Sequence, residues 1–244
     1  TGVREIDFGA DVVFPGLVDT HVHINDPGRA DWEGFEHATR AAAAGGVTTL
    51  VDMPLNSIPP TTTVNGLEQK RAAARGRCYV DVGFWGGVVP GNADDLAPLA
   101  RAGVLGFKCF LCPSGVEEFG HVAEAALRQA LPVTAALGLP LLAHAELPSL
   151  LVELQNADSA DGKVRDPRRY ATWLESRPYA SQQGAIELLV RLASEFRARV
   201  HIVHLASADA LASIGGARAS GVPITVETCT HYLTFCAEDV AGGD

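Results

Sequence analysis

The sequence predicts a parallel α/β fold, either a (β/α)8 barrel of the TIM type or an open doubly wound sheet. Three observations lead to this prediction. Short β-rich apolar runs alternate with amphipathic or alanine-rich helical stretches, many helical stretches end at a glycine, and the alternation passes through seven strand candidates.

The candidate elements follow one another at regular spacing. The strand candidates are residues 16–23, 48–53, 79–88, 103–110, 140–144, 200–205 and 223–228. The helical candidates are residues 32–44, 66–74, 94–102, 122–137, 182–197 and 208–220. Seven strands fit either a barrel truncated after its seventh strand or an open doubly wound sheet, and the pattern alone does not separate the two. A Gly-x-Gly-x-x-Gly motif does not follow the first strand, so the dinucleotide-binding form of the open sheet has little support.

Two segments depart from this spacing. Residues 1–14 look like the remnant of a small N-terminal β domain, and we assign residues 15–244 to the incomplete barrel. Residues 147–180 form a polar insertion that we expect to shape the mouth of the site. It carries, among other charged residues, Asp158, Asp161, Arg165, Asp166, Arg168 and Arg169.

The composition indicates a soluble protein with one large core. The chain has 244 residues, is 47% hydrophobic and carries a formal net charge of -10. This charge argues against nucleic-acid and anionic-membrane partners. The apolar runs stay well short of the roughly 20 residues of a spanning helix. Five cysteines, an odd number, suit reduced thiols, so we predict a cytoplasmic location.

Histidines gather where the predicted strands end. His21 and His23 lie at i and i+2, so their side chains project to one face and suit a metal, although such a pair also serves in ordinary hydrogen bonds. His144 and His204 end two later strands. In a barrel this edge is where catalytic residues collect. His201 is interpreted as a surface or opposite-face position, as are His37 and His121.

Lys108 lies near the end of an otherwise apolar strand candidate. Its stem could be buried while its ammonium reaches water. Alternatively, desolvation lowers its pKa and leaves a neutral amine that captures CO2, forming a carbamate that can bridge two metals beside the histidines.

Several longer motifs carry a family resemblance. Residues 15–23, 45–49 and 52–56 resemble the cyclic amidohydrolases of the amidohydrolase superfamily, and the match spans nearly the whole chain. Within that group, residues 27–29, 32–36, 53–56, 106–111 and 227–229 are most similar to allantoinases.

The resemblance implies a metal-dependent enzyme of purine metabolism that opens allantoin to allantoate. It implies two Zn2+ ions, or similar divalent metals, joined by a CO2-derived carboxylate on Lys108. The implied ligands are His21, His23, Lys108, His144 and His204. It also implies a small cyclic ureide substrate and a homotetramer. In the family an aspartate on the eighth strand transfers the proton; we expect it beyond Asp244, and expect these 244 residues alone to be inactive.

Other functions stay open at this point. Dihydroorotases carry an arginine directly after His-x-His, whereas Ile24 follows here, and hydantoinases carry a tyrosine where this chain has Pro113. A broader hydantoinase or dihydropyrimidinase activity, or a non-catalytic scaffold role, are the alternatives. Asn56 is a candidate for binding substrate, or is a turn-forming residue.

Overall fold

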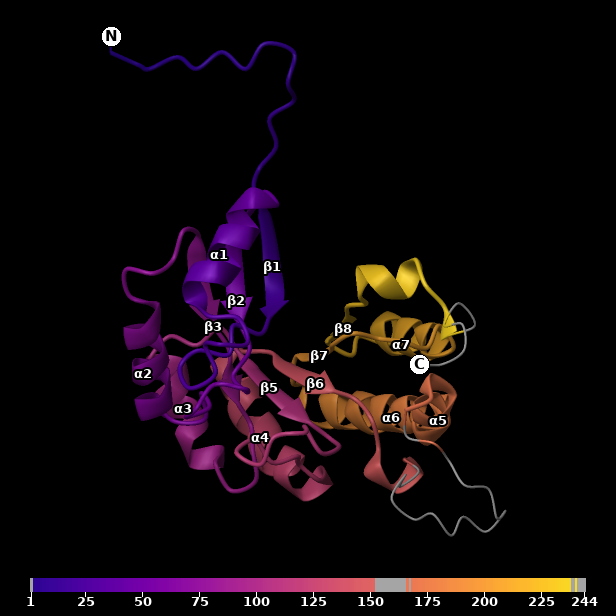
Figure 1. Ribbon diagram of the computed structural model, residues 1–244. Helices are drawn as coiled ribbons and strands as arrows, with labels where there is room; N and C mark the ends of the chain where they lie inside the picture. Colours follow the sequence, from indigo (N-terminus) through magenta and orange to yellow (C-terminus); the bar gives the residue numbers. More distant parts are fainter. Residues whose placement is uncertain (1, 152–165, 167, 238–239, 241–244) are drawn as a thin grey trace.

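Parallel strands form the centre of the structure, a computed structural model that describes residues 2–151, 166, 168–237 and 240 (Figure 1). The first sheet pairs, in order, β1 (Leu17–Val22), β2 (Val47–Asp52) and β3 (Asp81–Phe84). The second pairs β4 (Gly86–Gly87), β5 (Phe107–Phe110), β6 (Leu141–His144), β7 (Val200–Ile202) and β8 (Ile224–Val226). Every pairing is parallel and the strand order never reverses, which favours a barrel over a doubly wound sheet.

A single residue, Trp85, separates the two sheets. Its backbone N–H donates to the Asp52 carbonyl at 3.0 Å, whereas the N–H of Gly86 donates to the Gly106 carbonyl at 2.9 Å. The strand predicted at residues 79–88 is therefore two short strands that carry the chain from one sheet to the next. The Trp85 indole Nε1 also donates to the Thr20 carbonyl of β1 at 2.8 Å, so this residue contacts both of the other strands of the first sheet.

The helices lie close to their predicted positions. They are α1 (Phe35–Ala44), α2 (Val64–Ala74), α3 (Ala93–Arg101), α4 (Glu124–Leu137), α5 (Tyr170–Ser176), α6 (Tyr179–Phe196) and α7 (Ala210–Ala219). Two 3-10 helices, η1 (Pro148–Leu150) and η2 (Thr230–Leu233), complete the described elements. α4 ends as expected at Gly138, whose φ of 68° lies in the left-handed region that glycine adopts without strain.

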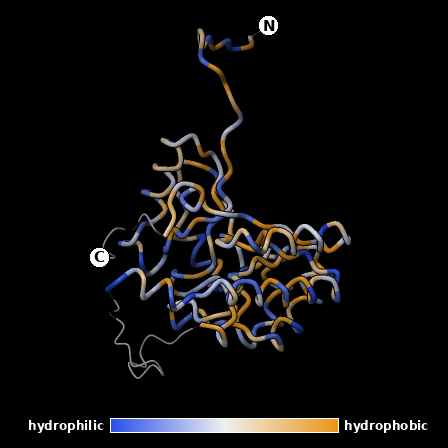
Figure 2. Tube along the Cα trace, turned by 90° about the vertical axis from the view of Figure 1, so that its right-hand side faces the viewer, coloured by the Kyte–Doolittle hydropathy of each residue, from blue (hydrophilic) through white to orange (hydrophobic). Residues whose placement is uncertain are grey.

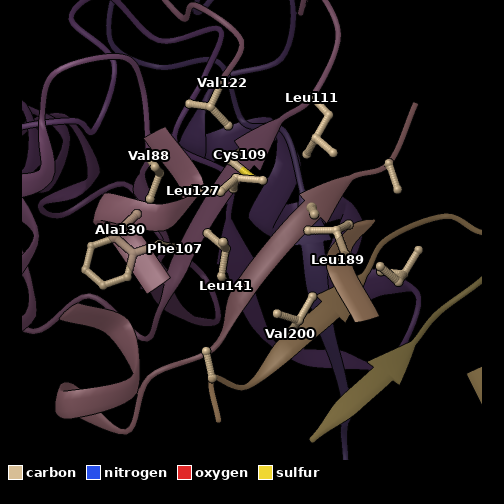
Figure 3. Close-up of a cluster of buried hydrophobic side chains, with 14 of the residues drawn as sticks. Val88, Phe107, Cys109, Leu111, Val122, Leu127, Ala130, Leu141, Leu189 and Val200 are labelled. Carbon is tan, nitrogen blue, oxygen red and sulfur yellow. The ribbon is translucent and has the colours of Figure 1, made fainter. Parts of the chain in front are cut away.

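Apolar side chains alternate between the two faces of the strands. Phe107 and Cys109 of β5 belong to the large cluster between the strands and the helices (Figure 3). Phe110 instead joins a smaller cluster with Leu142 and Val203. Successive residues of a strand point to opposite faces, so Lys108 shares the face of Phe110 and lies away from the helices.

Residues 2–14 are exposed, form neither helix nor strand, and lead away from the rest of the molecule (Figures 1 and 2). Their assignment to a separate β domain stays a prediction. The polar insertion contains η1 and α5, which the sequence pattern did not predict, while Asp158, Asp161 and Arg165 lie outside the described residues. Among the helices described, not one has the length and apolar character needed to cross a membrane.

A buried ion pair joins β2 to α2. Lys70 Nζ donates to Asp52 Oδ2 at 2.5 Å and to the Met53 carbonyl at 2.8 Å. Asp52 Oδ1 accepts the Ile24 N–H at 2.7 Å, and both charged side chains are at most 1% exposed. Asp52 therefore holds two segments in place: the backbone directly after His23, and α2 through Lys70.

Replacing Lys70 by Met is expected to lower the free energy of unfolding by about 3–5 kcal/mol, because the Asp52 charge is left buried without its partner. Urea denaturation of the metal-free chain measures this. The double variant D52N/K70M should regain part of the loss. R128M, at a partly exposed ion pair, is the control and should change stability by about 1 kcal/mol or less. A K70M loss no larger than that of R128M contradicts the prediction.

Candidate metal centre

The structure brings the five predicted metal-site residues together, the four histidines at the carboxyl ends of their strands and the lysine within its strand. His21 lies in β1 and His23 directly after it, Lys108 lies in β5, His144 ends β6, and His204 follows β7. The His21 ring centroid lies 5.6 Å from that of His23 and 5.5 Å from that of His204, and the His144 and His204 centroids lie 4.8 Å apart. Parallel strands place these ends on one edge.

Lys108 is buried beside the histidines. Its side chain is among the largest fully buried ones described, and Nζ lies 4.9 Å from the centroid of the Phe110 ring. Phe110 in turn stacks on His144 with centroids 4.6 Å apart and an interplanar angle of 12°. Burial lowers the pKa of Lys108 to about 7, so a substantial fraction of its amine is neutral near neutral pH. The residue is not a snorkelling surface lysine.

The histidines are poor bases in this setting. Burial lowers the pKa of His23 to about 3 and that of His204 to about 2, with the Coulombic effect of Lys108 in the same direction. Burial also lowers the pKa of His144. These imidazoles stay neutral at physiological pH and keep a nitrogen lone pair for a metal.

The spacing of two ring nitrogens fits a shared metal ion. His144 Nδ1 and His204 Nε2 lie 3.2 Å apart. Two nitrogens bound to one tetrahedral zinc at about 2.0–2.1 Å lie roughly 3.3–3.4 Å apart. The two rings are therefore close to the arrangement that one ion requires.

Two carboxylates to which the sequence gave no role contact ring nitrogens of these histidines. Glu227, directly after β8, has Oε1 2.5 Å from His21 Nδ1 and Oε2 3.3 Å from His201 Nε2. The interpretation of His201 as a surface or opposite-face residue is wrong, because its ring faces Glu227 and is 21% exposed. The sequence signal for Glu227 was its two-residue spacing from Thr225, which places both side chains on one face of the last strand.

Glu146 holds His144 in a similar way. Its Oε2 lies 2.6 Å from His144 Nε2 and accepts the Arg177 guanidinium at 2.6 Å. Cys112 Sγ lies 3.6 Å from the same oxygen, so thiol, imidazole and carboxylate form a compact group. Burial raises the pKa of Cys112 to about 11, and Arg177 already neutralises Glu146, so this group is satisfied without a cation. Glu146 lies two residues after His144, which was its sequence signal.

Asn56 lies at the mouth against a site histidine. Its backbone has a left-handed φ of 68°, and its Nδ2 lies 3.4 Å from His23 Nδ1. Arg29 donates to the Asn56 carbonyl at 2.9 Å and forms an ion pair with Glu118. These contacts join the loops that follow β1, β2 and β5. The role of Asn56 in substrate binding stays a prediction.

The fold and this cluster of strand-end histidines are consistent with a family assignment. The Amidohydrolase family model matches residues 12–211, and the chain belongs to that family. The predicted resemblance and the predicted barrel fold class are thereby confirmed.

Relatives and solved structures narrow the class. An allantoinase of Streptomyces avermitilis is 54% identical over 99% of this chain and 53% of its own length. A mitochondrial allantoinase of Aquarana catesbeiana is 47% identical over 100% and 49%. The L-hydantoinase (dihydropyrimidinase) structure from Arthrobacter aurescens has a TM-score of 0.84 and 31% identity, covering 92% of this chain and 49% of that chain. The chain spans about half the length of the curated relatives it matches.

The low pKa of Lys108 predicts a pH-dependent stability of the metal-free chain. Between about 7 and the ordinary pKa of 10.5, the unfolded lysine holds a proton that the folded lysine has lost. Stability should therefore rise with pH across this window, by up to about 1.4 kcal/mol per pH unit.

Urea denaturation at pH 7, 8 and 9, in chelator and without bicarbonate, measures this slope. In K108M the lysine contribution disappears, and the variant should be more stable than the wild type at pH 7. Parallel pH profiles of the two proteins would show that Lys108 is charged in the folded chain.

Proposed function

We propose that the protein is a cyclic-amide hydrolase that opens allantoin to allantoate. The observation that carries this proposal is the convergence of four strand-end histidines on a buried lysine whose pKa is about 7. The choice of allantoin is supported by curated relatives that are named allantoinases and are 42–54% identical to this chain.

Two divalent metals, with zinc as the preferred ion, fit the donor set of this site. The residues that would hold them are His21, His23, carboxylated Lys108, His144 and His204. Neutral imidazoles and anionic oxygens are ligands that zinc accepts. When bound, such ions polarise a ring carbonyl and lower the pKa of water, which prepares an amide for hydrolysis.

Lys108 is suited to carry the bridging carboxylate. Its neutral amine attacks CO2, an N–C bond forms, and the proton released from the nitrogen passes to solvent. The product is an anionic carbamate with two oxygen donors, whereas a protonated lysine offers none. Burial among apolar side chains favours the amine over the ammonium and so makes this reaction possible near neutral pH.

The residues around the site would position rings and substrate. Glu227 and Glu146 orient His21 and His144 through their outer nitrogens. The Asn56 amide, at the mouth, would orient a ring carbonyl or N–H of the ureide. We further propose a homotetramer and a cytoplasmic location, which follow from the family resemblance and the composition.

A hydantoinase of broader range is the second candidate, because solved structures similar to this one include hydantoinases. Their identity to this chain is 26–31%, well below that of the allantoinases. A scaffold role is disfavoured, since all five metal-site positions are kept and meet in space.

Assays of the protein at its full natural length should show the highest kcat/KM for allantoin among allantoin, hydantoin, dihydrouracil and dihydroorotate. H23A should lose more activity than the roughly 10–100-fold that loss of an outer hydrogen-bond partner costs. H121A, at an exposed histidine, is the matched control and should behave as wild type. A preference for dihydrouracil would refute the choice of allantoin.

Carboxylation of Lys108 is testable without turnover. After incubation with zinc and ¹³C-labelled bicarbonate, the protein should show one carbamate carbon resonance by NMR, and removal of CO2 at acidic pH should abolish it. K108A should lack the resonance, and H121A, at an exposed histidine, should keep it. A resonance that persists in K108A would place the carbamate elsewhere.

A further inference from the structure

The backbone of Glu227 is held in place by hydrogen bonds to β7 and to the residues that follow it, independently of its side chain. Its N–H donates to the Ile202 carbonyl at 3.0 Å, and its carbonyl accepts the Leu205 N–H at 2.8 Å. These bonds continue the parallel pairing of β8 with β7. The carboxylate therefore projects from a rigid strand end, between His21 on one side and His201 on the other.

His201 and Thr225 extend this contact along the strands. The two residues are register partners of β7 and β8, and His201 Nδ1 lies 2.8 Å from Thr225 Oγ1. Glu227 is two residues beyond Thr225, so both side chains lie on one face. The result is a continuous chain of contacts from Thr225 through His201 and Glu227 to His21.

The charge on Glu227 determines which group donates and which accepts in each of these hydrogen bonds. A glutamate carboxyl is ionised at neutral pH, and each oxygen of Glu227 lies within hydrogen-bond distance of an imidazole nitrogen. An ionised carboxylate only accepts hydrogen bonds. His21 Nδ1 and His201 Nε2 must therefore both carry hydrogens, which leaves His201 Nδ1 to accept the Thr225 hydroxyl and His21 Nε2 with a free lone pair.

We propose that Glu227 and His201 are positioning residues that fix the tautomer and ring orientation of His21 and thereby set the affinity of the site for its divalent metal. This inference rests on the proposed function, because it assigns His21 to the metal. Glu227 acts directly on the ring, and His201 holds the second carboxylate oxygen so that the carboxylate cannot turn away. The side chains that make both contacts are half-buried, which limits competition from water for these hydrogen bonds.

Zinc affinity of the chain, measured by competition with a chromophoric chelator, tests the proposal. E227A should bind zinc about 10–100-fold more weakly, as expected for loss of an outer partner of a ligand. H201L, which has no donor, should also weaken binding, whereas H201Q keeps an N–H near the position of Nε2 and should restore it. E124A, at a partly exposed carboxylate bound to Arg191 on α6, is the matched control and should bind as wild type.

The tautomer of His21 gives a second readout that needs no metal. Long-range ¹⁵N NMR of the metal-free chain should show His21 with hydrogen on Nδ1, and E227A should show a mixture of tautomers. This comparison also shows whether a variant is folded. Zinc affinities of E227A and H201L within about twofold of wild type, or hydrogen on Nε2 of His21 in the wild type, would overturn the proposal.

Failure of the proposed function looks different. If the full-length protein binds zinc but does not open allantoin, the role of Glu227 and His201 stands and the substrate is wrong. If the wild-type chain does not bind zinc, the assignment of the metal fails, and the proposal falls with it even where the tautomer is as expected.

Discussion

The parallel pairing of the strands is the constraint from which the site follows. Because every strand runs in the same direction, the polar residues at their carboxyl ends meet at one edge. Water is largely excluded there by apolar neighbours, so burial works against each positive charge. Lys108, His23 and His204 consequently all have lowered pKa values. One topological rule thus both assembles the donors and removes their protons.

Much of this could be predicted from the sequence, because the relevant signals are local. Alternating apolar runs located the strands, and a histidine or lysine at a strand end is visible without knowledge of the fold. The partners of those residues were not predictable. Glu227 is 206 residues from His21, and which face of a three-residue strand turns inward cannot be read from so short a pattern. The division at Trp85 also depends on pairing with two different neighbours.

The two carboxylates behind the histidines differ in their own partners. Glu146 is neutralised by Arg177, which directly follows α5, so this contact joins His144 to the polar insertion. The described side-chain partners of Glu227, His21 and His201, lie on β1 and β7, so its position depends on strands of the two sheets. One histidine of the site is therefore coupled to a surface segment, while the other is held by the rigid scaffold.

Phe110 lies against both kinds of donor in this site. One face of its ring stacks on His144, and the Lys108 amine lies within cation–π distance of the same ring. A smaller residue at this position would loosen the imidazole and, at the same time, admit water to the amine. A substitution of Phe110 would therefore change both donors together. This one aromatic ring couples the pKa of Lys108 to the orientation of His144.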